Sequence, residues 1–351
     1  MEFEYANAGS RTHEYGNAAK SAVERARESV GLAVDADKSE VIFTSGATEA
    51  NNMAILGLEA YAKEEGKRHI ITSAIEHKAV LEPVTLLQSR GFDVTVLKPE
   101  ADGIVAPEEL LRALTPQTVL VSLMHANNET GALQPITSYA DVLNEHAAYF
   151  HVDAAQSYGK EVAPLLNKRI DLMSCSAHKL YGPKGIGALI VRRRKYKWPP
   201  IKPLMVGGGQ ERGLRPGTLP VHQIAGFGMA VKLAMENYLY RKEVCLKIKQ
   251  QGIEALKKLS VNYHSPLDAL PSTLNFSIPG VNSEAAIIAL KGVAAVSNGS
   301  ACTSSSYTPS HVLSAMGLDE EDIEGALRFS WCHMTGEVPW SEIVERLRSL
   351  R

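Results

Sequence analysis

The chain has 351 residues, 45% of them hydrophobic, so it is long enough to form two domains with a buried core in each. Its formal net charge of −2 gives no basic surface field, and we therefore expect no direct binding to nucleic acid. The sequence contains no run of about 18 apolar residues and no basic, apolar leader, so we expect a cytoplasmic protein without a membrane segment.

Apolar runs rich in β-branched residues alternate with longer amphipathic runs through the first part of the chain. In chain order the apolar runs are EVIFTSG, HIITSAIEH, DVTVLK, TVLVSLMHANN, AYFHVDAAQ, DLMSCSAH and GALIVRRR. Amphipathic runs such as ATEANNMAILGLEAYAKEEG and KAVLEPVTLLQSRG separate the first of them. This alternation is typical of βα units in which helices cover a mostly parallel sheet, so the sequence predicts the α/β class.

The pattern changes after residue 220. Two long helical segments, HQIAGFGMAVKLAMENYLY and RKEVCLKIKQQGIEALKKL, are followed by STLNFSI and further helix. We therefore predict a large domain over 1–240 and a smaller C-terminal α+β domain over 241–351. The polar stretch VSNGSACTSSSYTPSHVL predicts a loop at 296–310 in the second domain. The pair Thr308-Pro309 fits the N-cap and first position of the helix after it.

Polar residues gather where the predicted strands end. They are Gly46, Ala47, Thr48 and Glu49 after the first strand, His77 after the second, Asn127, Asn128 and Glu129 after the fourth, Asp153 and Gln156 after the fifth, and Ser176, His178 and Lys179 after the sixth. Because ligands of open α/β sheets bind at the carboxyl ends of the strands, we expect these groups to face one pocket. Taken singly, Thr48 could merely lie near a helix start, Asp153 could cap a helix or pair with a neighbour, and His77 could be an ordinary strand-end histidine.

The turn SGATE, at 45–49, is expected to bind an anion, because a small turn that opens a helix exposes backbone N–H groups. Nucleotide binding is disfavoured, since the chain has neither GxxxxGK[ST] nor a GxGxxG after its first predicted strand. Pyridoxal 5'-phosphate suits the pattern better. It needs phosphate donors, a carboxylate that keeps its ring nitrogen protonated, and a lysine for a Schiff base. Asp153 and Lys179 would supply the last two, although an exposed loop lysine is the simpler reading of Lys179 alone.

Seven motifs carry a resemblance to a known family. They are SGATEANN, EHKAVLEP, MHANNETG, HVDAAQ, SAHKLYGPKGIGAL, GGGQERGLRPGTLPVHQ and SNGSACTSS. In this order they resemble the cysteine desulfurases, which are pyridoxal-phosphate enzymes of aminotransferase class V with the fold type I architecture. The resemblance spans 5–335 and is closer to the subgroup with a long cysteine-bearing loop. It implies conversion of L-cysteine to L-alanine and transfer of the sulfur to an acceptor protein.

The resemblance also implies residue roles around the cofactor. Lys179 would carry the cofactor and later move protons, with burial and a nearby cation lowering its pKa. Asp153 would pair with the ring nitrogen, Gln156 would contact the phenolic oxygen, and His77 would stack on the ring and act in acid–base steps. Thr48, Ser176 and His178 would hold the phosphate, and the remaining cofactor contacts would come from Ala47 and Asn128.

Substrate and subunit contacts follow from the same resemblance. Asn128 and Arg328 match positions that receive the substrate carboxylate, for which the planar fork of arginine is suited. The alternative for Arg328 is a helix-end salt bridge. Thr218, in RPGTLP, matches a residue that reaches the phosphate of the neighbouring subunit, so the resemblance implies a homodimer with composite sites.

The four cysteines, at positions 175, 245, 302 and 332, form no CxxC motif, so we expect no disulfide framework and no metal site. Cys302 lies among serine, threonine and glycine residues, where nothing predicts burial. The resemblance makes Cys302 the nucleophile that takes the sulfur as a persulfide. That sulfur must then reach an acceptor, which predicts a mobile loop. We interpret the other three cysteines as structural.

The start of the chain departs from the family pattern. Family members begin with a few dozen further residues, including a strand and a threonine-rich turn near the cofactor, and this chain starts within the region that follows. Ala6-Asn7-Ala8 also replaces the usual glycine-asparagine-proline. We therefore expect a shortened N-terminal segment and an altered wall on the substrate side.

Two alternatives to a desulfurase remain open at this point. One is another class V activity, such as a selenocysteine lyase or an aminotransferase for a small amino acid, whose turnover would not depend on Cys302. The other is a non-catalytic, desulfurase-like partner protein. For a true desulfurase the acceptor stays open among iron–sulfur scaffolds, tRNA-thiolating enzymes and DNA phosphorothioation systems.

Overall fold

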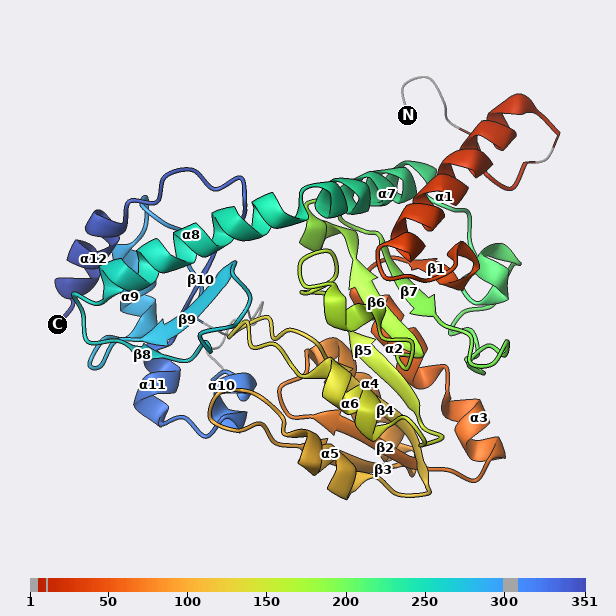
Figure 1. Cartoon of the computed structure of the whole chain (residues 1–351), viewed down its shortest axis with the longest axis horizontal. Helices are drawn as coiled ribbons and strands as arrows, with labels where there is room; N and C mark the ends of the chain where they lie inside the picture. Colours follow the sequence, from red (N-terminus) through yellow and green to blue (C-terminus); the bar gives the residue numbers. More distant parts are fainter. Residues whose placement is uncertain (1–5, 11, 299–308) are drawn as a thin grey trace.

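Two separate sheets organise the computed structural model, in which residues 6–10, 12–298 and 309–351 are described. The larger sheet has seven strands in the order β1-β7-β6-β5-β4-β2-β3, and the smaller has three in the order β10-β9-β8. Figure 1 shows them in two lobes, here called the large lobe and the small lobe, with the consecutive helices α7 and α8 running from one to the other.

The large sheet is mostly parallel, as predicted. Its parallel pairs are β2–β3, β2–β4, β4–β5 and β5–β6, whereas β7 runs antiparallel to both β1 and β6. Apart from β3 and Tyr149, every residue of its strands is buried, which is the burial expected when helices cover both faces. The strands are β1 (Val41–Thr44), β2 (His69–Ser73), β3 (Asp93–Leu97), β4 (Thr118–Met124), β5 (Tyr149–Asp153), β6 (Leu172–Ser176) and β7 (Gly187–Val191).

Helices cover both faces of this sheet. One face packs against α1 (Glu14–Leu32) and α7 (Val221–Glu236), and the other packs against α2 (Ala47–Leu56) and α4 (Lys78–Ser89). Successive side chains of a strand point to opposite faces of the sheet. In β1, Phe43 accordingly belongs to the first core, with α1 and α7, and Ile42 belongs to the second core, with α2 and α4. The shorter helices of this lobe are α3 (Glu59–Glu64), α5 (Pro107–Ala113) and α6 (Ile136–Val142).

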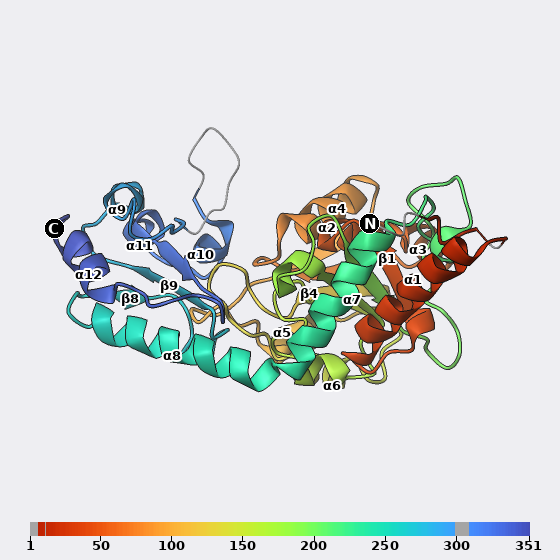
Figure 2. The ribbon, with the colours of Figure 1, turned by 90° about the horizontal axis from the view of Figure 1, so that it is seen from above.

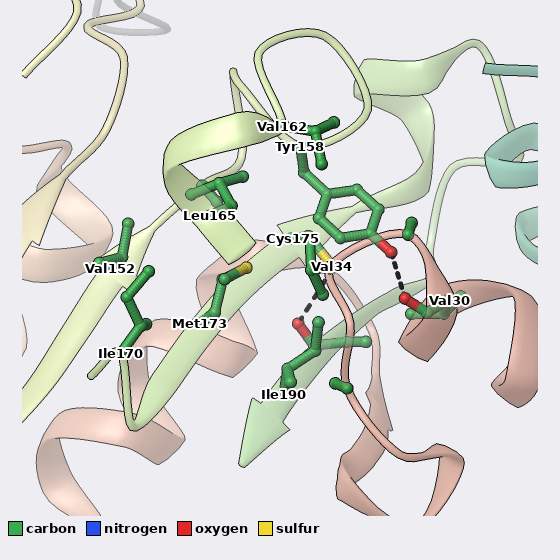
Figure 3. Packing of buried hydrophobic residues seen from close by; sticks show 14 of the residues in the cluster. Val30, Val34, Val152, Tyr158, Val162, Leu165, Ile170, Met173, Cys175 and Ile190 are labelled. Atoms are coloured by element: carbon green, nitrogen blue, oxygen red, sulfur yellow. Dashed lines mark hydrogen bonds between the residues drawn. The ribbon is translucent and has the colours of Figure 1, made fainter. Parts of the chain in front are cut away.

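Figure 3 shows the first core at close range. The Tyr158 hydroxyl donates a hydrogen bond of 2.5 Å to the carbonyl of Val30, which ties the segment after β5 to the end of α1. Cys175 is fully buried beside it, and burial raises the pKa of its thiol above the usual range. This cysteine is therefore kept as an unreactive thiol in the core.

The small lobe is an antiparallel sheet with helices against it. Its strands are β8 (Asn262–Tyr263), β9 (Thr273–Ser277) and β10 (Leu327–Ser330), and its helices are α8 (Tyr238–Leu256), α9 (Ser283–Ala289), α11 (Glu320–Gly325) and α12 (Trp340–Arg348). Gly252 of α8 permits the packing of α12, because a Cβ there would come within 2.7 Å of the Trp340 ring. The Trp340 ring stacks on Phe329 of β10. Figure 2 shows α8 lying along the outside of this lobe.

The break between the two long helices differs from the prediction. The sequence pattern placed it between Tyr240 and Arg241, but α7 ends at Glu236 and Asn237 (φ −110°, ψ 18°) separates it from α8. Asparagine favours such non-helical positions because its side chain competes for backbone hydrogen bonds. The domain boundary at 240 stays a prediction. Within the described ranges, no helix combines the length and the apolar character needed to cross a bilayer.

The helix start predicted at Thr308-Pro309 is wrong. The helix in question is α10 (His311–Ala315), and its N-cap is Ser310, whose hydroxyl accepts the Leu313 N–H at 3.2 Å. Serine is a strong N-cap residue, so the cap falls two positions later than the threonine that precedes the proline. Thr308 lies outside the described residues.

Candidate active site

A pocket of about 650 Å³ lies where the strands of the large sheet end. The predicted site residues that line it are Ala47, Thr48, His77, Asn128, Asp153, Gln156, Ser176, His178, Lys179 and Arg328. All come from the large lobe except Arg328, which β10 brings from the small lobe. Thr218 is exposed and does not line this pocket, and Cys302 lies outside the described residues.

A buried carboxylate forms one end of the pocket. Asp153 is the last residue of β5, and its oxygens accept hydrogen bonds from the Ala155 N–H at 2.9 Å and from the Asn51 side-chain amide at 2.7 Å. Burial raises the pKa of this carboxyl, while the two hydrogen bonds and the charges of His77 and Lys179 oppose the rise. Asp153 is therefore held in one orientation in a site of low polarity.

Asn51 is a pocket residue that the sequence analysis missed. It is fully buried, and its Oδ1 has no hydrogen-bond partner, although its Nδ2 holds Asp153. Its place on α2, one turn after Ala47, was the signal that could have found it, because residues four apart share a helix face. Asn51 therefore keeps one unused hydrogen-bond acceptor in the lining of the pocket.

Lys179 lies on a short 3₁₀ turn (Ala177–Leu180) directly after β6. The turn ends because Tyr181 adopts the left-handed conformation (φ 66°, ψ 20°), which an L side chain rarely takes, so the geometry is imposed by the surrounding fold. Burial lowers the pKa of the Lys179 amine, the positive charge of Arg328 lowers it further, and Asp153 opposes both. Lys179 is thus more readily deprotonated than an exposed lysine.

The part of the pocket at the start of α2 is suited to an anion. Helix α2 begins at Ala47, and its N-cap Gly46 makes no side-chain capping bond, so the first N–H groups of a ten-residue helix are left for a ligand. The Ser176 hydroxyl and His178 Nδ1 lie 2.8 Å apart beside it. Glu49, in the first turn of α2, would repel an anion, but an ion pair of 2.9 Å with Arg215 offsets its charge.

His77 is fixed at the N-terminus of α4. Its Nδ1 accepts the Ala79 N–H at 3.0 Å, which makes the histidine the N-cap of the helix. Since Nδ1 is an acceptor in this bond, the neutral ring carries its proton on Nε2. His77 lines the same pocket as Asp153 and Asn128. His77 can therefore offer an N–H donor to a bound group.

Arg328 closes the pocket on the side of the small lobe. Its Nη1 donates to the carbonyl of Asn128 at 3.0 Å, and its Nε is buried without a hydrogen-bond partner. Burial lowers the pKa of the guanidinium and the negative charge of Glu129 opposes this. A half-buried arginine with an unused donor is suited to bind a carboxylate in two-point fashion.

Comparison with known proteins gives one family. The family model described as aminotransferase class-V matches residues 1–337. The chain belongs to this family. Its relatives include the cysteine desulfurase IscS of Vibrio campbellii, which is 45% identical over 352 residues covering 99% of this chain and 86% of the relative. These matches place the chain with the cysteine desulfurases of class V, an enzyme family that uses pyridoxal phosphate.

Solved structures agree with that assignment. The crystal structure of DndA from Streptomyces lividans is 46% identical, with a TM-score of 0.83 and coverage of 93% of this chain and 92% of that chain. A structure of SspA in complex with cysteine is 40% identical, with a TM-score of 0.81 and coverage of 93% and 91%. The predicted fold type I architecture is thereby confirmed.

Proposed function

We propose that this chain is a pyridoxal-phosphate-dependent cysteine desulfurase that converts L-cysteine to L-alanine and receives the sulfur on Cys302 as a persulfide. The observation that carries the proposal is that one pocket joins Lys179, the buried Asp153, an uncapped helix N-terminus and Arg328. That combination serves a cofactor with a ring nitrogen, an aldehyde and a phosphate, together with a substrate that has a carboxylate. When bound, the cofactor supplies an electron sink at the substrate carbon.

The residues present fit that cofactor. Asp153 would hold the ring nitrogen protonated, and the Asn51 bond would keep its carboxylate in place for this purpose. Lys179 would make the covalent attachment. The open N–H groups of α2, with Thr48, Ser176 and His178, would bind the phosphate, while Gln156 would contact the phenolic oxygen.

Lys179 and His77 would move the protons. Because burial and Arg328 lower the pKa of the Lys179 amine, more of it is neutral near pH 7 than for an exposed lysine. The neutral Nζ would take a proton from the substrate carbon and return one to the carbon that becomes the methyl group of alanine. The Nε2–H of His77 would serve the acid–base steps beside the ring.

Arg328 and Asn128 would bind the substrate carboxylate. The Arg328 Nη1 is already held by the Asn128 carbonyl, so the rest of the guanidinium is oriented before substrate arrives. The thiolate of Cys302 would then attack the sulfur of the bound cysteine. A new S–S bond forms, the C–S bond breaks, and its electron pair stays on the carbon that is later protonated.

The neighbouring subunit and the sulfur acceptor belong to the same proposal. The exposed Thr218 would reach the phosphate of the neighbouring subunit in a homodimer, which is consistent with its position away from the pocket of its own chain. The persulfide would pass to an acceptor protein, for which iron–sulfur assembly, tRNA thiolation and DNA phosphorothioation remain the alternatives.

Activity with and without Cys302 tests the proposal. The purified chain with pyridoxal phosphate, cysteine and a thiol reductant should release alanine and sulfide in equal amounts. The C302A variant should lose this turnover, whereas C332A, which removes a half-buried cysteine outside the pocket, should keep it. Turnover that survives C302A would favour another class V activity, and a chain that binds no cofactor would be the non-catalytic partner.

A further inference from the structure

The turn after β4 is the main junction between the pocket and the small lobe. Four consecutive carbonyls, from residues 128 to 131, each accept a hydrogen bond from the small lobe. The donors are the Arg328 guanidinium at 3.0 Å, the Asn275 side chain at 3.3 Å, the Ser265 hydroxyl at 2.5 Å and the Leu270 N–H at 2.8 Å. Such a continuous set of bonds fixes the turn to the small lobe along its whole length.

Glu129 is the charged residue of this turn, and it is only 5% exposed. Its carboxylate accepts the Ser310 hydroxyl at 2.5 Å, and its negative charge acts on Arg328. Burial raises the pKa of the Glu129 carboxyl, whereas the Ser310 bond and the charges of His311 and Arg328 lower it. A buried carboxylate needs a hydrogen-bond donor, and the Ser310 hydroxyl supplies one to Glu129.

Ser310 is the first of two contacts that hold the start of α10. Its hydroxyl also caps the helix by accepting the Leu313 N–H, and His311 Nε2 donates to the Glu76 carbonyl at 2.9 Å. Val312 and Leu313 pack against Ile75 and Met124 at the ends of β2 and β4. The segment that contains Cys302 is therefore followed in the chain by a helix that is bonded to Glu129 and Glu76 and packed against Met124, which lines the pocket.

We propose that Glu129 is a positioning residue of the reaction: its carboxylate holds Ser310, which anchors the helix after the cysteine-bearing segment, on the same turn whose Asn128 carbonyl holds the substrate arginine Arg328. The inference rests on the proposed function. Glu129 touches neither cofactor nor substrate in this scheme and acts through Ser310 and through the turn that it shares with Asn128. Loss of the Ser310 bond would slow sulfur transfer to Cys302 after cysteine has bound, while loss of the Glu129 charge would also disturb carboxylate binding at Arg328.

Steady-state kinetics of E129Q, S310A and the double variant test this scheme. S310A should lower kcat about tenfold and leave KM within twofold, because a hydrogen bond to a charged group is lost without a change at Arg328. E129Q should lower kcat by a similar factor and also change KM several-fold. The double variant should fall no further than about twofold below E129Q, since both changes act on one interaction: glutamine keeps an acceptor for the Ser310 hydroxyl but loses the charge that strengthens the bond.

Two further variants separate positioning from stability. S310T, which keeps a hydroxyl, should restore kcat to within threefold, and S314A, which removes an exposed hydroxyl bonded only within α10, should match the wild type. Melting temperatures identify any variant that fails to fold. The inference would be overturned if folded S310A and E129Q had the kcat and KM of the wild type. It would also be overturned if the kcat of the double variant fell about a hundredfold. Absence of alanine formation by the wild type would instead refute the proposed function.

Discussion

The two ends of the pocket are built in different ways. The Asp153 end is formed by residues at the ends of buried strands and by Asn51 of a helix packed on the same sheet. The Arg328 end is formed where a turn of the large lobe meets the small lobe, through side chains and loop carbonyls. We infer that the sheet holds the groups that would bind the cofactor in fixed positions. The contact between the two lobes would instead set the positions of the substrate and of the attacking sulfur.

The largest expected effect is at the sheet end. Lys179→Ala should reduce alanine formation more than about a thousandfold, because both the cofactor attachment and the proton carrier are lost. Lys197→Ala, at an exposed position on the segment after β7, is the matched control and should behave as wild type. Alanine assays at saturating cofactor make the comparison, and a Lys179→Ala enzyme within tenfold of wild type would remove Lys179 from the mechanism.

A smaller loss is expected for Asp153→Asn. The amide can still accept the Ala155 N–H, but it has no charge to hold a proton on the ring nitrogen, so kcat should fall about a hundredfold. Cofactor affinity should change less than kcat. If kcat stayed above half of the wild-type value, the buried carboxylate would have only a structural role.

A substitution at the Arg328 end of the pocket should change the KM for cysteine. Arg328→Lys keeps a positive charge but loses the planar fork, so KM for cysteine should rise about tenfold with a smaller change in kcat. Initial rates over a range of cysteine concentrations give both parameters. A fall in kcat at unchanged KM would show that Arg328 acts on the chemical step and not on substrate binding.

The last effect concerns stability and not activity, at a buried residue outside the lining of the pocket. Glu76 is fully buried, its Oε1 accepts hydrogen bonds from Ser73 and from the Met124 N–H, and its carbonyl accepts His311 Nε2. Burial raises the pKa of its carboxyl from 4.5 to about 8, so the folded chain keeps a proton that the unfolded chain releases above pH 4.5. Stability should therefore decrease as the pH rises from 5 to 8, by up to about 1.4 kcal/mol per pH unit.

The Glu76→Gln variant isolates this contribution. Since glutamine does not titrate, the melting temperature of the variant should depend less on pH over the same range than that of the wild type. Thermal melts at pH 5, 6, 7 and 8 provide the test. Parallel curves for the two proteins would mean that Glu76 does not hold a proton in the folded state.

The sequence predicted the sheet end better than the junction. Asp153 and Lys179 follow apolar runs in a repeating βα pattern, and the carboxyl ends of parallel strands must share one edge, so their convergence followed from local signals. Asn51 was missed because its role depends on which face of α2 meets β5. The polar character of Glu129 was visible at a strand end, but nothing near it in the chain indicates a bond to Ser310.

The start of α10 shows, at a single residue, the same limit of prediction from the sequence. Both Thr308 and Ser310 are residue types that cap helices, and the proline between them favours the first choice. Ser310 is the cap in the folded chain, where its hydroxyl also bonds Glu129, a residue 181 positions away in the sequence. Contacts of that range decide between two locally acceptable caps, and no local pattern contains them.

The mass of the Cys302 peptide tests the central claim most directly. The holoenzyme would be mixed with cysteine in the absence of reductant, alkylated, digested and compared with the Lys179→Ala variant. Cys302 of the wild type should gain the mass of one sulfur atom, while the peptides of Cys175, Cys245 and Cys332 should gain none, and neither should Cys302 in the variant. Alanine formation by the wild type without added sulfur on Cys302 would contradict it.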